Sequence, residues 1–379
     1  MIYLDYNATT PCDPEVVAAM LPYFSQKFGN AASKTHPYGW IADEAVEQAR
    51  RQVARLIGAT EQEVIFTSGS TEGCNLALKG VFELYAVKGN HIITCVTEHK
   101  AVLDTCQHLE QRGATVTYLP VDAAGLISLE ELEAAIRPET ILIAVMYANN
   151  ETGVIQPVKA IGAIAKKHKV LFFSDATQAA GKLPLDVQTD GIDLLALSAH
   201  KLYGPKGVGA LYIRRKGPRV SLKAQIDGGG HERGFRSGTL NVPGIAGLGK
   251  ACSLCSEGME AEQQRLRSLR DQLEQGLLQS GDVSVNGSLQ SRMPHVSNLS
   301  FRGIKAERMI SALNSELAFS VGSACTSASK APSHVLEAMG LDQASLDGAI
   351  RFSLGRFTTA EEIAQTINLV RAQLDRLKY

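Results

Sequence analysis

An apolar run over residues 192–197 leads into His200-Lys201, after which Gly204-Pro205 turns the chain away. Such a run, bounded by turn residues, predicts a buried strand with a lysine at its end. A lysine in that place is partly desolvated, so its amine loses its charge more easily and can attack an aldehyde to form a Schiff base. The alternative is an ordinary surface lysine, which is the more common situation at the end of a strand.

Two other predicted strands end in residues that favour the chemical interpretation. Asp175 follows an apolar run that begins at Val170, so its carboxylate is expected to be buried and to need a partner. Ser70 and Thr71 follow another strand and open a helix, whose free N–H groups would bind a phosphate. An ordinary Ser/Thr N-cap would leave the same pattern. An amine for an aldehyde, an acid for a pyridinium nitrogen and a phosphate site together indicate pyridoxal 5'-phosphate (PLP).

Polar residues follow two further predicted strands. His99 comes after the strand over residues 91–94, and Asn149-Asn150 come after the buried strand over residues 141–146. Open α/β sheets bind ligands at this edge, where an imidazole could stack on a flat ring and move protons. The asparagines could bind ligand oxygens. A surface histidine and a simple turn are the alternatives for these two segments.

The order of the predicted elements indicates two regions of different architecture. Strands alternate with helices to about residue 240, which is typical of an α/β fold with a mostly parallel sheet. A long helix over residues 262–280 and strands at 296–301 and 350–354 then suggest a smaller α+β domain. A chain of 379 residues is long enough for two domains.

Composition excludes several classes of partner. The net charge of -1 gives no electrostatic reason to expect binding to nucleic acid or to an anionic membrane. The longest apolar runs, such as residues 141–148, are far too short to span a bilayer. The N-terminal sequence lacks the pattern of a signal peptide, so we expect a cytoplasmic protein. The odd number of cysteines, seven, argues against a disulfide framework.

Cys325 stands in a segment of glycine, serine, alanine and threonine over residues 320–329. Small residues give a core little bulk, so this context favours an exposed thiol in a mobile loop. Free cysteines are also commonly small buried residues, and the segment by itself leaves both interpretations open.

Taken together, the sequence resembles the NifS/IscS-like cysteine desulfurases, which are class V aminotransferase-family, fold-type I PLP enzymes. The resemblance covers almost the whole chain and rests on the motifs at residues 3–5, 8–10, 66–69, 97–100, 149–151, 175–178, 198–201, 236–239, 322–327 and 351–356. It implies a large PLP-binding domain over residues 13–259, with a seven-stranded, mostly parallel sheet between helices. Residues 1–12 and 260–379 would form the small domain that carries the mobile Cys325 loop. It also implies a homodimer with active sites at the subunit boundary.

The resemblance assigns a role to each candidate residue. Lys201 resembles the Schiff-base lysine, and Cys325 resembles the nucleophile that carries the persulfide. The phosphate ligands would be Ser70, Thr71, Ser198, His200 and, from the other subunit, Thr239. Asp175 would pair with the pyridinium nitrogen, Gln178 would contact the ring oxygen, and His99 would stack on the ring and transfer protons. Asn150, at the cofactor, and Arg351 would hold the substrate carboxylate, Arg351 in a bidentate manner. No metal site is implied.

The implied reaction removes sulfur from L-cysteine, giving L-alanine and a persulfide on Cys325 that passes to an acceptor such as an iron–sulfur scaffold protein. Relatives that dock such a scaffold often continue beyond the position of Tyr379, so docking is an open expectation. A second difference is Val321, which stands where similar desulfurases usually have a serine. The nearer alternative is a selenocysteine lyase or another PLP-dependent aminotransferase-type reaction. The more distant one is a non-catalytic interaction protein that retains the fold.

Overall fold

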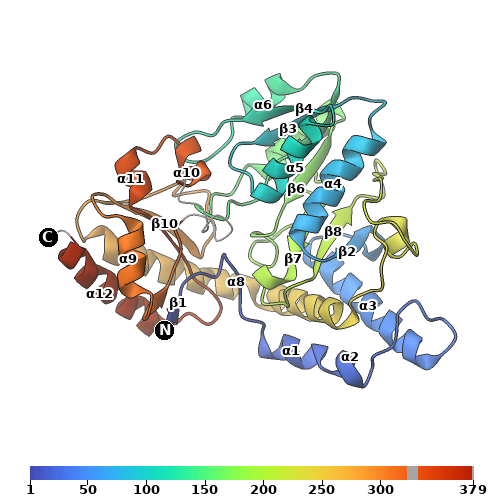
Figure 1. The fold of residues 1–379 in the computed structure, drawn as a ribbon, viewed down its shortest axis with the longest axis horizontal. Helices are drawn as coiled ribbons and strands as arrows, with labels where there is room; N and C mark the ends of the chain where they lie inside the picture. The colour runs from blue at the N-terminus through green and yellow to red at the C-terminus, as the bar shows by residue number, and fades with distance from the viewer. Residues whose placement is uncertain (322–331, 378–379) are drawn as a thin grey trace.

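The structure is a computed structural model that describes residues 1–321 and 332–377. Within these residues the larger part is built on a seven-stranded sheet (Figure 1). Its strands are β2 (Val64–Thr67), β3 (His91–Cys95), β4 (Thr115–Leu119), β5 (Thr140–Ala144), β6 (Leu171–Asp175), β7 (Leu194–Ser198) and β8 (Gly209–Ile213). Their order is β2-β8-β7-β6-β5-β3-β4; β8 pairs antiparallel with both neighbours, and the other pairings are parallel. The predicted α/β fold with a mostly parallel seven-stranded sheet is therefore confirmed.

Helices cover both faces of this sheet, which explains why its central strands are continuous apolar runs. On one face, α4 (Ser70–Leu84) and α5 (Lys100–Glu110) pack over side chains such as Leu142 and Phe173. On the other face, α3 (Pro37–Leu56), α6 (Leu129–Ala135), α7 (Val158–His168) and the first half of α8 (Val242–Leu278) pack over Ile143 and Phe172. Neighbouring residues in one strand thus enter two different cores, because successive side chains point to opposite faces.

The second part contains a three-stranded antiparallel sheet in the order β12-β10-β9. Its strands are β9 (Val283–Val285), β10 (Val296–Phe301) and β12 (Ala349–Ser353), and the second half of α8 packs on it with α9 (Ala306–Leu313) and α12 (Ala360–Leu377). The N-terminal strand β1 (Ile2–Tyr3) pairs with β11 (Leu317–Ala318) and so belongs to this part. Figure 1 shows α8 running from the large sheet to the small one.

Short elements complete the described chain. They are α1 (Pro14–Met20), α2 (Pro22–Ser25), α10 (His334–Ala338), α11 (Gln343–Asp347) and the 3-10 turns η1 (Glu61–Glu63), η2 (Ala199–Lys201) and η3 (Glu232–Gly234). In the described residues, no helix combines the length and the apolar character that crossing a membrane requires.

The helix predicted from residue 262 begins twenty residues earlier, at Val242. Its first turns contain Gly244, Gly247 and Gly249, which are poor helix formers and hid the helix from a propensity argument. Close packing explains these glycines, since a Cβ on Gly249 would lie 2.6 Å from Cα of Ala49 in α3. Tertiary contact thus overrides local preference at this crossing of two helices.

Candidate active site

Residues that follow the carboxyl ends of five strands line one cavity. Because β2, β3, β5, β6 and β7 run in the same direction, their carboxyl ends lie along one edge of the sheet. The predicted residues that line the cavity are Ser70, Thr71, His99, Asn150, Asp175, Gln178, His200, Lys201 and Arg351. Among the described residues, the lining also includes Asn7, Ala8, Met146, Ala148 and Thr177. Amine, carboxylate, imidazole and guanidinium groups therefore meet in one place.

Two of the predicted residues that the structure describes are not part of this lining. Ser198 is buried at the end of β7, and its Oγ would lie 3.6 Å from a Cβ placed on Gly69, next to the start of α4. Thr239 is exposed and lies outside the cavity of its own chain. Cys325 lies outside the described residues.

The start of α4 has the properties of an anion site. Gly69 precedes the helix with a φ of 155°, a conformation that L side chains rarely adopt, and as the N-cap residue it offers no side chain to cap the first N–H groups. Ser70 and Thr71 place their hydroxyl-bearing side chains at the cavity from this first turn. Uncapped N–H groups and the positive end of the helix dipole attract phosphate oxygens.

Lys201 is held by carbonyl groups of the N-terminal segment. Its Nζ donates to the carbonyl oxygen of Asn7 and, at 2.6 Å, to that of Ala8. The Asn7 carbonyl also accepts from Gln178 Nε2 at 3.1 Å. Asn7 itself is fixed by its N–H, which donates to Ser353 Oγ at 2.9 Å in β12. The amine is therefore oriented by a segment whose strand, β1, pairs within the second part of the molecule.

Asp175 is buried and fixed through both carboxylate oxygens. Its Oδ1 accepts from the N–H of Thr177 at 2.9 Å and from the Thr177 hydroxyl. Its Oδ2 accepts from the Cys74 thiol at an S···O distance of 3.8 Å. Burial, and then the charge of Asp175, raise the pKa of Cys74 well above its ordinary value, so this thiol stays a donor.

Glu98 and His99 form the junction between β3 and α5. Burial, and secondarily repulsion by Asp175, raise the pKa of Glu98 well above the usual range, which favours the neutral form of this side chain. Its Oε1 accepts from the N–H of Met146 at 2.5 Å. His99 Nδ1 accepts from the N–H of Ala101 at 3.1 Å, so a neutral His99 ring carries its proton on Nε2.

Two more basic groups near Lys201 have lowered pKa values. Burial and then repulsion by Lys201 lower the pKa of Lys182 to about 7, and its Nζ donates to Gln178 Oε1 at 3.2 Å. Burial and then the charges of Lys201 and Lys206 lower the pKa of His200 to about 4. His200 is therefore neutral at pH 7, and its Nδ1 lies 3.1 Å from the Thr9 hydroxyl.

Arg351 brings a guanidinium to the cavity from β12 in the second part. The side chain is 1% exposed, and its Nη2 pairs with Asp5 Oδ1 at 2.6 Å. Its Nη1 donates to the carbonyl oxygen of Asn150 at 2.9 Å. Within the described residues its Nε has no hydrogen-bond partner. A buried arginine with an unused donor at a cavity is suited to bind a carboxylate.

With this geometry in place, comparison with known proteins identifies the family. The class-V aminotransferase family pattern matches residues 2–366. The cysteine desulfurase IscS of Anaeromyxobacter sp. (strain Fw109-5) is 54% identical over 378 residues, covering 100% of this chain and 93% of that relative. The chain belongs to the cysteine desulfurases of the class-V aminotransferase family. A solved NifS-like protein is 38% identical, with a TM-score of 0.93 over 99% of this chain and 100% of its own. Another, titled SspA in complex with cysteine, is 38% identical, with a TM-score of 0.83 over 95% and 100% of the chains.

Enzymes of this family depend on PLP, and the cavity fits that cofactor. The uncapped start of α4, with Ser70 and Thr71, suits the phosphate group. The buried carboxylate of Asp175 suits the ring nitrogen, and the amine of Lys201 suits the aldehyde. All three groups face one cavity, as the cofactor requires, so the lining of this cavity suits the cofactor on which the family depends.

Several residues of the desulfurase site were not predicted from the sequence. Asn7 and Ala8 act through backbone carbonyl groups, for which side-chain chemistry gives no signal. Lys182 lies seven residues after the end of β6, and its Nζ donates to the side chain of Gln178, four residues earlier in the sequence. Thr177 could have been found, since an aspartate two residues before a threonine commonly forms a local Asx turn.

Proposed function

We propose that this desulfurase removes sulfur from L-cysteine and releases L-alanine, with the sulfur first held as a persulfide on Cys325. The observation that supports this most is the presence of Lys201, Asp175 and Arg351 on one cavity. These groups match an aldehyde, a ring nitrogen and a substrate carboxylate. The names of the similar proteins, a cysteine desulfurase and a protein in complex with cysteine, support the same substrate.

The residues that would hold the cofactor are those that surround the cavity. The phosphate would be bound by the start of α4 and by Ser70, Thr71, Ser198 and His200, and His99 would lie on the ring. Asp175 would keep the ring nitrogen protonated, and Gln178 would donate to the ring oxygen. When bound, PLP supplies an electron sink that makes the substrate α-proton acidic. The Lys201 amine removes that proton at Nζ, and Asn7 and Ala8 keep the amine in reach.

The substrate is oriented by its carboxylate. Arg351 and Asn150 bind this group, and Asp5 keeps the guanidinium in position through its ion pair. The Cys325 thiolate then attacks the substrate sulfur. A sulfur–sulfur bond forms, the bond between that sulfur and the substrate β-carbon breaks, and the carbon takes up a proton to give alanine. The Lys201 amine, which is protonated when it removes the α-proton, can supply such a proton, and His99 lines the same cavity for proton transfer at Nε2.

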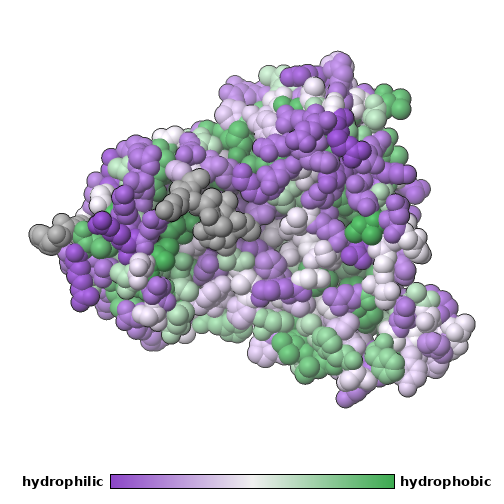
Figure 2. Space-filling view, viewed as in Figure 1, coloured by the Kyte–Doolittle hydropathy of each residue, from purple (hydrophilic) through white to green (hydrophobic). Residues whose placement is uncertain are grey.

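The same proposal includes a homodimer. Apolar side chains that are 52–63% exposed gather around α1, α2 and the start of α3; they are Leu21, Phe24, Phe28, Tyr38 and Trp40. Figure 2 shows a hydrophobic surface over α1 and α2. Exposed apolar patches of this kind commonly mark an interface, and a second copy would cover it. The exposed Thr239 would then reach the cofactor phosphate of the other subunit.

The remaining parts of the proposal concern organisation and setting. We take residues 13–259 as the cofactor domain and residues 1–12 and 260–379 as the small domain that carries Cys325, with α8 continuous across residue 259. The six cysteines in the described residues are free thiols, which is usual in the reducing cytoplasm. The acceptor of the persulfide sulfur would be a thiol-bearing protein, such as an iron–sulfur scaffold.

Alanine release from L-cysteine tests the proposal directly. Wild-type protein with PLP should form alanine, and mass spectrometry after brief exposure to L-cysteine should show one added sulfur on the peptide that contains Cys325. Cys325→Ser should still bind PLP and L-cysteine but form almost no alanine, because a hydroxyl cannot accept the sulfur. Alanine formation by Cys325→Ser at the wild-type rate would refute the role of Cys325 and favour a lyase.

A further inference from the structure

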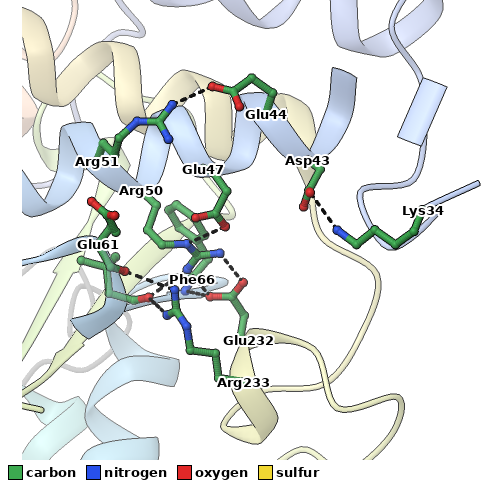
Figure 3. Close-up of polar contacts among 11 residues, drawn as sticks. Lys34, Asp43, Glu44, Glu47, Arg50, Arg51, Glu61, Phe66, Glu232 and Arg233 are labelled. Carbon is green, nitrogen blue, oxygen red and sulfur yellow. Dashed lines mark hydrogen bonds and ion pairs between the residues drawn. The ribbon is translucent and has the colours of Figure 1, made fainter. Parts of the chain in front are cut away.

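The loop over residues 228–239 is attached to β2, although its glycines suggest a flexible segment. Glu232 is buried in this loop, and its carboxylate forms two hydrogen bonds with Arg50 of α3, at 2.8 and 2.9 Å (Figure 3). The two side chains are 1% and 4% exposed. A bidentate pair of this kind fixes both distance and orientation.

Edge strand β2 completes this attachment. The N–H of Phe66 donates to Glu232 Oε2 at 2.7 Å, and Val64 O accepts from Arg50 Nη1 at 2.8 Å. The Arg50 guanidinium also lies 4.7 Å from the centre of the Phe66 ring. Arg233 adds a bond from its Nη1 to Val64 O at 3.0 Å. Side chains thus pair with the backbone groups of β2, the strand that leads into the phosphate-binding start of α4.

The backbone of the loop is strained at this attachment. Glu232 and Arg233 have φ values of 49° and 58°, a left-handed conformation that is costly for residues other than glycine. Such a conformation persists only where surrounding contacts hold it. We infer that the ion pair between Arg50 and Glu232 supplies these contacts.

A second attachment lies closer to Thr239. Arg236 pairs with Glu72 in the first turn of α4, with bonds from Nε at 2.9 Å and from Nη2 at 3.3 Å. Glu72 also accepts from the N–H of Ser68. Both attachments lie within the loop, and Thr239 is exposed just beyond them. The loop is therefore held by the same strand and helix that form the phosphate site of its own chain.

We propose that Arg50 and Glu232 are positioning residues that fix residues 228–239 so that Thr239 reaches the cofactor phosphate of a second copy of this chain. This inference rests on the proposed homodimer. One ion pair would thereby link the phosphate site of one subunit to that of the other. The pair acts through the loop and touches neither substrate nor cofactor.

Glu232→Gln tests the role of the pair, because glutamine keeps the shape but leaves the Arg50 charge with only its pair to the more exposed Glu47, at 3.1 Å. The holoenzyme variant should bind PLP about tenfold to a hundredfold more weakly. This is the range expected when the hydrogen bond from Thr239 to the charged cofactor phosphate is lost. Trypsin should cleave it faster at Arg233 and Arg236. Glu44→Gln is the matched control, since it breaks an exposed pair with Arg51 at 2.6 Å on the same helix (Figure 3). Wild-type PLP affinity in Glu232→Gln would overturn the proposal.

Mixed dimers test whether the loop acts on the other subunit. In a dimer of Glu232→Gln with Lys201→Ala, one site combines an intact Lys201 with an intact loop from the Lys201→Ala chain. Absorbance titration should then recover one tight PLP site per mixed dimer, and alanine formation should return. Absence of that tight site would overturn the placement of the loop.

Two further measurements keep the outcome clear. If Glu232→Gln does not fold, the double variant Arg50→Met with Glu232→Met removes both charges together, which is often tolerated, and should still bind PLP weakly. Tight PLP binding by this double variant would refute the positioning role of the Arg50–Glu232 pair. Failure of wild-type protein to form alanine would instead count against the proposed function. The trypsin cleavage rates would still report on how the Arg50–Glu232 pair holds the loop.

Discussion

The buried lysine behind the active site gives a prediction for stability. Lys182 Nζ donates to Gln178 Oε1, and the titratable groups around it are Lys201, Arg351, Glu262 and the Cys255 thiol. Burial and the nearby amine of Lys201 lower its pKa from 10.5 to about 7. The substitution Lys182→Met keeps an unbranched chain of similar length and removes the charge. We expect this change to stabilise the protein in a pH-dependent manner.

The size of the effect follows from linkage. At about 1.4 kcal/mol per pH unit, the lowering of the pKa from 10.5 to about 7 corresponds to a cost of about 5 kcal/mol. Between these two pH values the unfolded chain binds the extra proton, so the stability of the wild type rises with pH in that window. The cost is complete below pH 7 and vanishes above 10.5. Allowing about 1 kcal/mol for the lost bond to Gln178, Lys182→Met should gain about 3 kcal/mol at pH 7 and about 1 kcal/mol at pH 9.

Urea unfolding followed by far-UV circular dichroism between pH 6 and 9.5 measures this difference. The protein should be free of PLP, because a cofactor attached to Lys201 would remove one of the two repelling amines. Lys167→Met is the control, since that side chain is 68% exposed and should show no such pH dependence. A difference between Lys182→Met and wild type that does not change with pH would refute the reasoning.

Three substitutions test the roles of individual site residues. Lys201→Ala should prevent covalent attachment, so borohydride reduction and peptide mapping should label the Lys201 peptide in wild type and no peptide in the variant; a pyridoxyl group on another lysine contradicts this. Asp175→Asn should bind PLP more weakly and form alanine slower by orders of magnitude, because an amide cannot keep the ring nitrogen protonated; near-wild-type turnover would oppose that role. Arg351→Gln should raise KM for L-cysteine by about tenfold to a hundredfold through the lost charged hydrogen bonds, and an unchanged KM would reject it as the carboxylate ligand.

The strand-end residues of the cavity were predictable for a physical reason. Parallel strands present their carboxyl ends along one edge of the sheet, so Asp175 and Lys201 had to approach each other once both strands were recognised. Chemical type then restricted the ligand, since an amine, an acid and a helix start suit few cofactors. Sequence order and residue type together were enough for this part of the site.

Contacts between distant segments were not predictable in the same way. The Arg50–Glu232 pair joins residues 182 positions apart, and the glycines around Glu232 suggested flexibility where the structure has a buried attachment. The carbonyl groups that hold Lys201 belong to Asn7 and Ala8, and every residue carries such a group. Arguments from propensity and motifs use residue types and residues close in sequence. They therefore miss contacts between distant segments, which exist only after the chain has folded.

The N-terminal segment shows how such contacts determine the chemistry. Asp5 holds the guanidinium of Arg351, and Asn7 and Ala8, two and three residues later, hold the amine of Lys201. A substrate carboxylate that binds Arg351 shares that guanidinium with Asp5. A displacement of Asp5 would, through this short stretch of backbone, move the carbonyl groups that accept hydrogen bonds from the Lys201 amine. We therefore expect substrate binding at Arg351 and the position of the Lys201 amine to be coupled through residues 5–8.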